Sequence, residues 1–361
     1  MGFNIFSSAG KTSSETKETD SVVKSIEFLP DQIRQVLGDS HLIKMPAEYA
    51  DATEVVVNGM GGSNLGAGMV KAIFSEQLKI PITICPGYNV PAHVGKNTLY
   101  IISSYSGNTE EPLSVYEKVK KKGAKIIAIT AKGSGKLEKM MVEDNIPGYI
   151  FKPDFNPSGQ PRLGLGYMVF GMAVILAKAG VFKIKVKDIE DLISFLEISD
   201  RKLRPAGEAK SNLAKKIATE LYGREAVLIG ADFLNGNLRI MRNQLCENSK
   251  NFASYLTLPE LNHYALESLA NPKDNQKNLA FLFFDSELYH PRIRKRSDLT
   301  KMIIKKNKIK VVSMPLVGKT KEIQAFEALQ LGTWVTYYLA MLNGVNPAEI
   351  HWVNWFKKQL K

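Results

Sequence analysis

The 361-residue sequence contains only two cysteines, Cys85 and Cys246, and it lacks the run of about 18–20 apolar residues that a membrane helix needs. Two cysteines are too few for a disulfide scaffold or a zinc site, so we expect two reduced thiols and a cytoplasmic protein. The first twenty residues lack the apolar core of a secretory signal and are mostly polar. They predict a flexible tail over residues 1–20.

Acidic residues are fewer than basic ones. The chain has 48 Lys and Arg against 36 Asp and Glu, a formal net charge of +12. Such a charge suits either nucleic acid or small anionic substrates. The basic residues are dispersed, and no basic stripe alternates with aromatic residues. We therefore expect no nucleic-acid partner and no membrane partner, and we interpret the charge as a field that attracts phosphorylated metabolites.

Strand-like segments alternate with helical ones in both halves of the chain. After a helical stretch over residues 21–50, the first half has predicted strands at Glu54–Asn58, Ile80–Cys85, Thr98–Ser103, Lys125–Thr130 and Gly148–Lys152. The second half has predicted strands at Ala226–Ala231, Asn278–Asp285 and Ile309–Met314. This alternation is typical of doubly wound parallel sheets.

The predicted helices complete two domains of similar layout. They span Leu65–Phe74, Glu110–Lys122, Leu137–Val142, Leu163–Ala179, Val186–Ile198, Asn212–Leu221, Leu234–Cys246, Asp298–Lys306, Ala325–Asn343 and Ala348–Leu360. We therefore predict an α/β fold of two αβα sandwich domains. The first domain covers residues 21–155, connecting helices cover 156–211, and the second domain with its C-terminal helices covers 212–361.

Two hydroxyl-rich loops follow predicted strands in the first domain. The first loop is Gly59-Met60-Gly61-Gly62-Ser63, and the second runs from Ser103 to Thr109 as SSYSGNT. Because the carboxyl ends of parallel strands meet at one edge of a sheet, we expect the loops to lie together. Glycines permit close backbone approach, and hydroxyls beside a helix N-terminus bind anions. The pattern predicts a site for a phosphate monoester.

The same residues exclude one other kind of Gly-rich phosphate site and argue against a second. The first loop contains no Gly-Lys-Ser/Thr, which excludes a P-loop. Gly59 and Gly61 fit the first two glycines of a dinucleotide fingerprint, but Asn64 stands where the third belongs. We therefore expect no nucleotide cofactor.

The second half carries groups suited to aldose–ketose chemistry. Glu247 lies in the segment NQLCENSK, and His263 follows sixteen residues later in LPELNH. Isomerisation requires a group that helps the sugar ring to open and a carboxylate base that moves a proton between C2 and C1. A glutamate, a histidine and a nearby cation are groups that such chemistry recruits.

Taken together, these segments resemble a known family. GMGGS and SSYSGNTEE resemble the phosphate loops of the sugar isomerase (SIS) domain, and NQLCENSK followed by LPELNH resembles the bifunctional phosphoglucose/phosphomannose isomerase family. The resemblance implies interconversion of glucose 6-phosphate and mannose 6-phosphate with fructose 6-phosphate through a cis-enediol, without a metal or cofactor. It covers about 300 residues in outline.

The resemblance also assigns roles to individual residues. It implies that Glu247 is the base, that His263 assists ring opening from the neighbouring subunit of a homodimer, and that Arg162 stabilises the enediolate. Lys357 would stabilise the developing oxyanion, with Lys358 as the alternative. The phosphate ligands implied by the resemblance are Gly62, Ser63, Ser104, Ser106 and Thr109.

Two alternatives remain at this point. One is an SIS isomerase of another phosphosugar, such as an aminosugar or a pentose phosphate. The other is a catalytically inert SIS module that senses a phosphosugar. A sensor needs the two hydroxyl loops but not Glu247, His263 and Lys357, and the sequence carries no appended DNA-binding element. The joint presence of these three residues favours catalysis. The sequence does not give the ratio of glucose to mannose activity.

Overall fold

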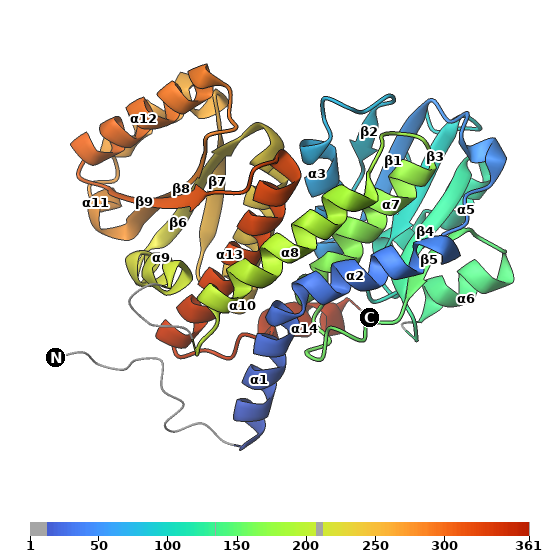
Figure 1. Cartoon of the computed structure of the whole chain (residues 1–361), viewed down its shortest axis with the longest axis horizontal. Helices are drawn as coiled ribbons and strands as arrows, with labels where there is room; N and C mark the ends of the chain where they lie inside the picture. Colours follow the sequence, from blue (N-terminus) through green and yellow to red (C-terminus); the bar gives the residue numbers. More distant parts are fainter. Residues whose placement is uncertain (1–12, 134, 207–211, 361) are drawn as a thin grey trace. The chain divides into compact units, whose positions relative to one another are not determined.

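The computed structural model describes residues 13–133, 135–206 and 212–360, and these form two compact units. The first unit is Phe28–Ser194, and the second consists of helix α1 (Ser13–Glu27) and the chain from Phe195 onwards. Each unit contains one parallel β-sheet (Figure 1). The fold is therefore the predicted α/β fold of two SIS-type sandwiches. Both cysteines are free, and no described helix is long and apolar enough to span a membrane.

The first sheet has five parallel strands in the order β2-β1-β3-β4-β5. The strands are β1 (Glu54–Gly59), β2 (Ile82–Ile84), β3 (Thr98–Ser103), β4 (Lys125–Ala131) and β5 (Gly148–Phe151). The helices of this unit are α2 (Leu29–Asp39), α3 (Gly62–Ile73), α4 (Glu110–Ser114), α5 (Tyr116–Lys121), α6 (Lys136–Glu143), the π-helix η4 (Gly166–Phe170) and α7 (Gly171–Lys178). Short 3-10 segments are η1 (Ser40–Leu42), η2 (Ala47–Tyr49) and η3 (Pro161–Leu163).

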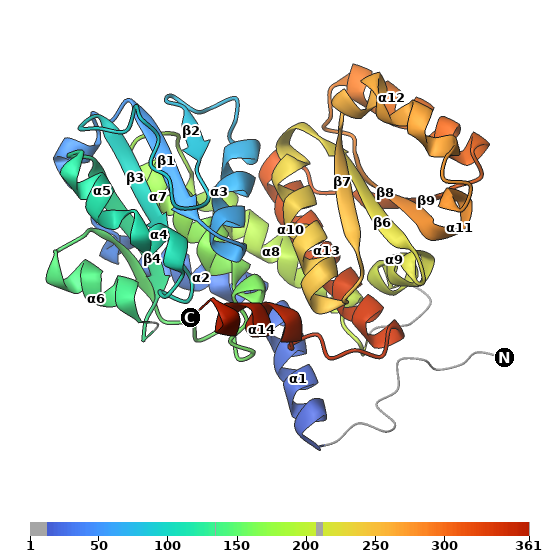
Figure 2. The ribbon, with the colours of Figure 1, turned by 180° about the vertical axis from the view of Figure 1, so that it is seen from behind.

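Helices cover both faces of this first sheet. Figure 1 shows α2 and α7 in front of it, and Figure 2 shows α5 and α6 on the opposite face. The strands are apolar on both faces because each face is buried. Val56, Tyr100 and Ala128, for example, contribute to a core with Val115 and Val119 of the α4–α5 segment.

The second sheet has four parallel strands in the order β7-β6-β8-β9. The strands are β6 (Glu225–Ala231), β7 (Ala253–Leu258), β8 (Leu279–Ser286) and β9 (Lys310–Leu316). The helices are α8 (Val186–Leu203, which begins in the first unit), α9 (Leu213–Leu221), α10 (Asn235–Asn248), α11 (Asn275–Asn278), α12 (Pro291–Lys306), α13 (Lys321–Leu342) and α14 (His351–Gln359). Short 3-10 segments are η5 (Asp232–Leu234), η6 (Glu260–His263) and η7 (Ala265–Ala270). Helix α13 packs against both α9 and α10, and α12 lies across the sheet from them (Figure 1).

The units group residues differently from the predicted domain boundaries. Residues 13–20, predicted as tail, are helical in α1, and residues 1–12 lie outside the described residues. Helix α1 joins the second unit because Val22 and Ile26 are buried and the helix packs against α13. The predicted connection 156–211 is divided between the units at Ser194, with residues 207–211 outside the described part.

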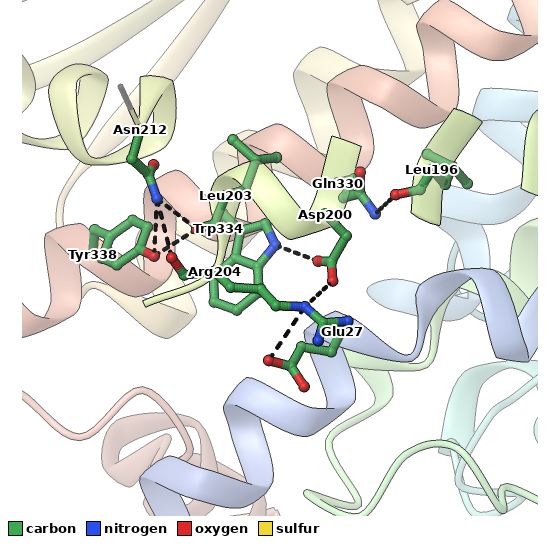
Figure 3. A network of polar contacts seen from close by, with 9 residues as sticks. All are labelled: Glu27, Leu196, Asp200, Leu203, Arg204, Asn212, Gln330, Trp334 and Tyr338. Atoms are coloured by element: carbon green, nitrogen blue, oxygen red, sulfur yellow. Dashed lines mark hydrogen bonds and ion pairs between the residues drawn. The ribbon is translucent and has the colours of Figure 1, made fainter. Parts of the chain in front are cut away.

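A buried polar network holds the end of α8 to α13 (Figure 3). The Trp334 indole donates to the Asp200 carboxylate over 2.9 Å, and the Gln330 amide donates to the Leu196 carbonyl over 3.1 Å. Arg204 pairs with Asp200 and lies 3.6 Å from Glu27 at the end of α1. These contacts explain why α1 and the end of α8 belong to the second unit.

Candidate functional site

The two hydroxyl loops follow neighbouring strands of the first sheet. Strands β1 and β3 are paired in parallel, with Gly59 opposite Ser103, so their carboxyl ends lie side by side. In the order β2-β1-β3-β4-β5 the chain connections diverge between β1 and β3, and this switch point is where doubly wound sheets bind ligands. The predicted meeting of the two loops is therefore present in the first unit.

The first loop depends on glycine at two positions. A Cβ on Gly59 would lie 2.7 Å from the Ser103 carbonyl oxygen, which leaves no room for a side chain. Gly61 has a φ of +50° and forms the N-cap of α3. The N-cap residue has no side chain to cap this helix, and the Ser63 and Asn64 N–H groups donate to the Met60 and Gly61 carbonyls, so the positive end of the helix dipole is what the first turn of α3 offers to an anion.

Ser63 joins the first loop to the second. Its side chain is buried, and its hydroxyl oxygen accepts a hydrogen bond of 2.8 Å from the backbone N–H of Tyr105. The Ser63 carbonyl in turn accepts a bond of 2.8 Å from the Ser103 hydroxyl. A hydroxyl that accepts one bond keeps its own proton to donate to a phosphate oxygen.

The second loop folds its hydroxyls around a turn. The Ser104 and Thr109 hydroxyl oxygens lie 2.7 Å apart, and Ser104 is fully buried. Gly107, with a φ of +63°, makes this turn possible. The Ser106 side chain is exposed, and its oxygen accepts from the Asn108 backbone N–H over 3.4 Å. Three of the predicted phosphate ligands, Ser104, Ser106 and Thr109, therefore lie in one short loop.

The helix after the second loop is shorter than predicted. The predicted helix Glu110–Lys122 divides into α4 and α5 at Val115. The first turn of α4 contains Glu110 and Glu111, whose negative charges oppose a bound phosphate. An anion at this loop would therefore be bound by the loop hydroxyls rather than by a helix N-terminus.

Arg162 lies beside the first loop. A Cβ on Gly62 would lie 3.5 Å from the Pro161 carbonyl oxygen and 3.8 Å from the Arg162 backbone nitrogen. The Arg162 side chain is buried, and one guanidinium nitrogen donates to the side-chain oxygen of Gln160 over 2.8 Å. The first unit thus brings Arg162 together with the loop of Gly62 and Ser63.

Sequence reasoning missed the residues that connect Arg162 to the second loop. The buried Asn156 amide donates to the Tyr105 hydroxyl over 2.8 Å. Burial raises the pKa of Tyr105, and this hydrogen bond opposes the rise, so the phenol is neutral near pH 7. The polar turn Asn-Pro-Ser-Gly from Asn156 to Gly159 was the available signal, but its composition indicates only a connection.

Glu247 lies at the amino edge of the second sheet. It is half-buried in the last turn of α10, the helix that leads from the end of β6 back to the start of β7. The next residues contact the segment that precedes α14, because Asn343 donates to the Ser249 carbonyl over 2.9 Å and Lys250 donates to the Asn346 carbonyl. The end of α10 and the segment leading to α14 therefore lie together.

Lys357 and its neighbour Lys358 are both exposed on α14. Trp352 and Trp355 on the same helix are also exposed, at 74% and 50%. Geometry within the second unit does not distinguish the two lysines, and the choice between them stays a prediction.

His263 lies at the opposite edge of the same sheet from Glu247. It is exposed at the end of η6, which follows the carboxyl end of β7. The preceding Asn262 anchors this segment to α12, donating to the Thr300 hydroxyl over 2.8 Å and accepting from Arg296 over 3.3 Å. Strand β7 has six residues, which at about 3.3 Å each separate the two edges by roughly 20 Å.

The switch point of the second sheet is filled by a side chain. Tyr289 is buried between the ends of β6 and β8, and its hydroxyl accepts from the Ala231 backbone N–H over 3.1 Å. The Phe233 ring packs 5.5 Å from the Tyr289 ring. The pair of hydroxyl-rich loops therefore lies at the switch point of the first sheet, whereas a buried tyrosine occupies the switch point of the second. In the described residues, no three or more His, Cys, Asp or Glu side chains form a metal-binding group.

Comparison with known proteins agrees with this division of the chain. The profile described as "SIS domain" matches residues 48–144, and the profile described as "Bacterial phospho-glucose isomerase C-terminal SIS domain" matches residues 210–360. A solved hypothetical protein from Thermus thermophilus superposes with a TM-score of 0.70 at 16% identity, covering 99% of this chain and 92% of that one. This likeness shows the fold.

Two curated relatives are similar over nearly their whole length. The bifunctional phosphoglucose/phosphomannose isomerase of Caldicellulosiruptor bescii is 31% identical over 93% of this chain and 98% of its own. The protein of the same name from Thermoplasma acidophilum is 32% identical over 85% of this chain and 90% of its own. The chain therefore belongs to the bifunctional phosphoglucose/phosphomannose isomerase family.

Proposed function

We propose that this chain is an aldose–ketose isomerase that interconverts glucose 6-phosphate and mannose 6-phosphate with fructose 6-phosphate, without a metal or cofactor. The observation that carries the proposal is the pair of loops tied through Ser63 and Tyr105 at the first switch point. The hydroxyls of Ser63, Ser104, Ser106 and Thr109, with the first turn of α3, suit a phosphate monoester.

In this proposal Glu247 is the base. Its carboxylate takes the proton from C2 of the open-chain aldose, which leaves a cis-enediol, and returns a proton to C1 to give the ketose. The hydroxyl proton at O2 moves to O1 in the same sequence, so atoms and charge balance. Because the reaction moves only protons, it requires no external oxidant or reductant.

The other groups stabilise charge or open the ring. Arg162 carries a fixed positive charge beside the phosphate loop, which suits an enediolate. Lys357 would stabilise the oxyanion that develops at the carbonyl oxygen. His263 would transfer a proton at the ring oxygen or the anomeric hydroxyl, as an imidazole does near neutral pH.

The positions of Glu247 and His263 support a homodimer. Since β7 separates the two residues by roughly 20 Å within one chain, a single copy does not bring both to the same C1–C2 unit. In a two-fold symmetric dimer, each copy supplies its His263 to the site that contains the partner's glutamate. We therefore propose that each active site contains His263 of a second copy.

Turnover of fructose 6-phosphate tests this function. The protein is incubated with fructose 6-phosphate and EDTA, and formation of both aldose phosphates is followed. We expect both products at the rate seen without EDTA. Loss of activity in EDTA would contradict the metal-free mechanism. Binding of fructose 6-phosphate without turnover would instead indicate a phosphosugar sensor.

A further inference from the structure

Hydrogen bonds at both the backbone and the side chain of Gln160 link Tyr105 of the second hydroxyl-rich loop to the Arg162 side chain, entirely within the first unit. Asn156 is at their centre: the side-chain amide donates to the Tyr105 hydroxyl over 2.8 Å and to the Gln160 carbonyl over 3.0 Å. Asn156 is 4% exposed and Tyr105 is 6% exposed. Both donors of one buried amide are therefore used to join these two segments.

The turn between Asn156 and Gln160 is closed by further bonds. The Ser158 hydroxyl donates to the Asn156 side-chain oxygen over 2.8 Å, and the Gln160 backbone N–H donates to the Ser158 oxygen over 3.3 Å. The Gly159 N–H also donates to the Asn156 carbonyl over 2.9 Å. These bonds fix the backbone from which the Gln160 side chain projects.

Close packing around Gly164 supports the same arrangement. A Cβ on Gly164 would lie 2.5 Å from the Tyr105 ring and 3.1 Å from the Asn156 amide nitrogen. Any side chain at position 164 would displace one of these two residues. The contact between Tyr105 and Asn156 therefore depends on the absence of a side chain at Gly164.

The last of these links is the bond between Gln160 and Arg162. The guanidinium donates to the Gln160 side-chain oxygen over 2.8 Å. A carboxylate at this position would orient the guanidinium equally well but would also cancel much of its charge. The amide oxygen of Gln160 is uncharged, so this bond orients the guanidinium without cancelling its charge.

We propose that Gln160 is a positioning residue, held by Asn156 and Ser158, that aims the Arg162 guanidinium at the bound phosphosugar without neutralising it. This inference rests on the proposed function. It predicts that replacing Gln160 lowers kcat more than it raises KM, because Arg162 acts on the negative charge of the enediolate.

The test compares Gln160→Ala, Arg162→Ala and the double variant with fructose 6-phosphate as substrate. We expect Gln160→Ala to lower kcat by about tenfold to a hundredfold. If Gln160 acts through Arg162, the double variant should be no slower than Arg162→Ala. Losses that multiply in the double variant would overturn the positioning role.

Two further variants separate positioning from packing. Gln160→Glu keeps the shape and the hydrogen bond but adds a negative charge, so we expect a loss of kcat at least as large as in Gln160→Ala. A Gln160→Glu variant as active as the parent would overturn the proposal. The matched control is Gln35→Ala, which also removes a side-chain amide: the Gln35 amide donates a hydrogen bond to the Lys152 carbonyl and accepts one from the Tyr167 hydroxyl. It should lose stability while its kcat is unchanged.

A spectroscopic measurement makes the outcome independent of turnover. In ¹⁵N NMR, a held guanidinium gives separate Nη signals for Arg162, and we expect Gln160→Ala to merge them. Unchanged Arg162 signals in Gln160→Ala would overturn the positioning role, whatever the activity. The two failures can be told apart. A parent protein that gives no turnover would contradict the proposed function, whereas an active parent with unchanged Arg162 signals in Gln160→Ala would contradict only the positioning role.

Discussion

The Ser63 hydroxyl accepts a hydrogen bond of 2.8 Å from the backbone N–H of Tyr105. This bond holds the first hydroxyl-rich loop against the second at the point where β1 and β3 end. Ser63 is therefore both a proposed phosphate ligand and the residue that fixes the distance between the two loops. Its removal should affect binding more than the loss of one exposed hydroxyl.

We predict that Ser63→Ala weakens phosphosugar binding. A hydrogen bond to a charged group contributes about 1.5–3 kcal/mol, so KM for fructose 6-phosphate should rise by about tenfold or more. The control is Ser114→Ala, which removes an exposed hydroxyl that donates to the Glu111 carbonyl. Steady-state kinetics measure both variants. An unchanged KM in Ser63→Ala would remove Ser63 from the phosphate site.

The two C-terminal lysines make a matched pair. If Lys357 stabilises the oxyanion, Lys357→Ala should lower kcat by about a hundredfold, because such electrostatic groups act on the transition state. Lys358→Ala, one residue further along the same exposed helix, should keep its kcat. Kinetic assays of both variants decide the assignment. The reverse result would assign the role to Lys358, and no loss in either would exclude α14 from the chemistry.

Hybrid dimers test whether His263 acts in the site of a second copy. Glu247→Gln and His263→Ala chains are co-expressed with different tags. In each hybrid one site contains both native groups, so random pairing should restore about a quarter of the parent activity, although each variant alone is inactive. If Glu247 and His263 of the same chain acted together, no mixture would recover activity.

The buried pair of Asp200 and Trp334 predicts a stability difference that depends on pH (Figure 3). Burial raises the pKa of the Asp200 carboxyl above its ordinary value of 3.8, and the bonds from Arg204 and Trp334 oppose the rise. Trp334→Phe removes a donor that favours the charged carboxylate, so it should lower the free energy of unfolding by about 1–3 kcal/mol near pH 7.

The sign of this pH dependence follows from the protonation state of Asp200 that Trp334 stabilises, which is the charged carboxylate. As pH falls through the raised pKa of native Asp200, the carboxyl becomes neutral and the lost bond matters less, so the difference between Trp334→Phe and the parent should shrink. Urea unfolding at two pH values measures it. Trp352→Phe is the control, because Trp352 is exposed and should show no effect at either pH. A difference independent of pH would show that Trp334 contributes only packing.

Most strands, and the loops that follow them, could be predicted from the sequence because buried parallel strands are almost uniformly apolar. Strand β7 (Ala253–Leu258) was missed because it is an edge strand, and four of its six residues are only half-buried. The start of α12 was also missed. It begins at Pro291 with His290 as N-cap, but its first turns contain arginines and a lysine rather than an apolar face.

The candidate site was predictable only where its residues are contiguous. The loops around Ser63 and Ser104 follow strands directly, so the periodicity of the strands locates them. The contact of Asn156 with Tyr105 joins residues fifty-one positions apart, and no local pattern indicates it. Similarly, sixteen residues separate Glu247 from His263, but the intervening strand carries them to opposite edges of the sheet.

Solvent exchange at C2 tests the central claim most directly. Fructose 6-phosphate is incubated with the protein in D₂O, and NMR follows deuterium at C1 of the ketose and C2 of both aldose products. The account predicts exchange with the parent protein and none with Glu247→Gln, which should still bind fructose 6-phosphate. Exchange by Glu247→Gln at the parent rate, or a parent protein that binds the sugar without any exchange, would contradict it.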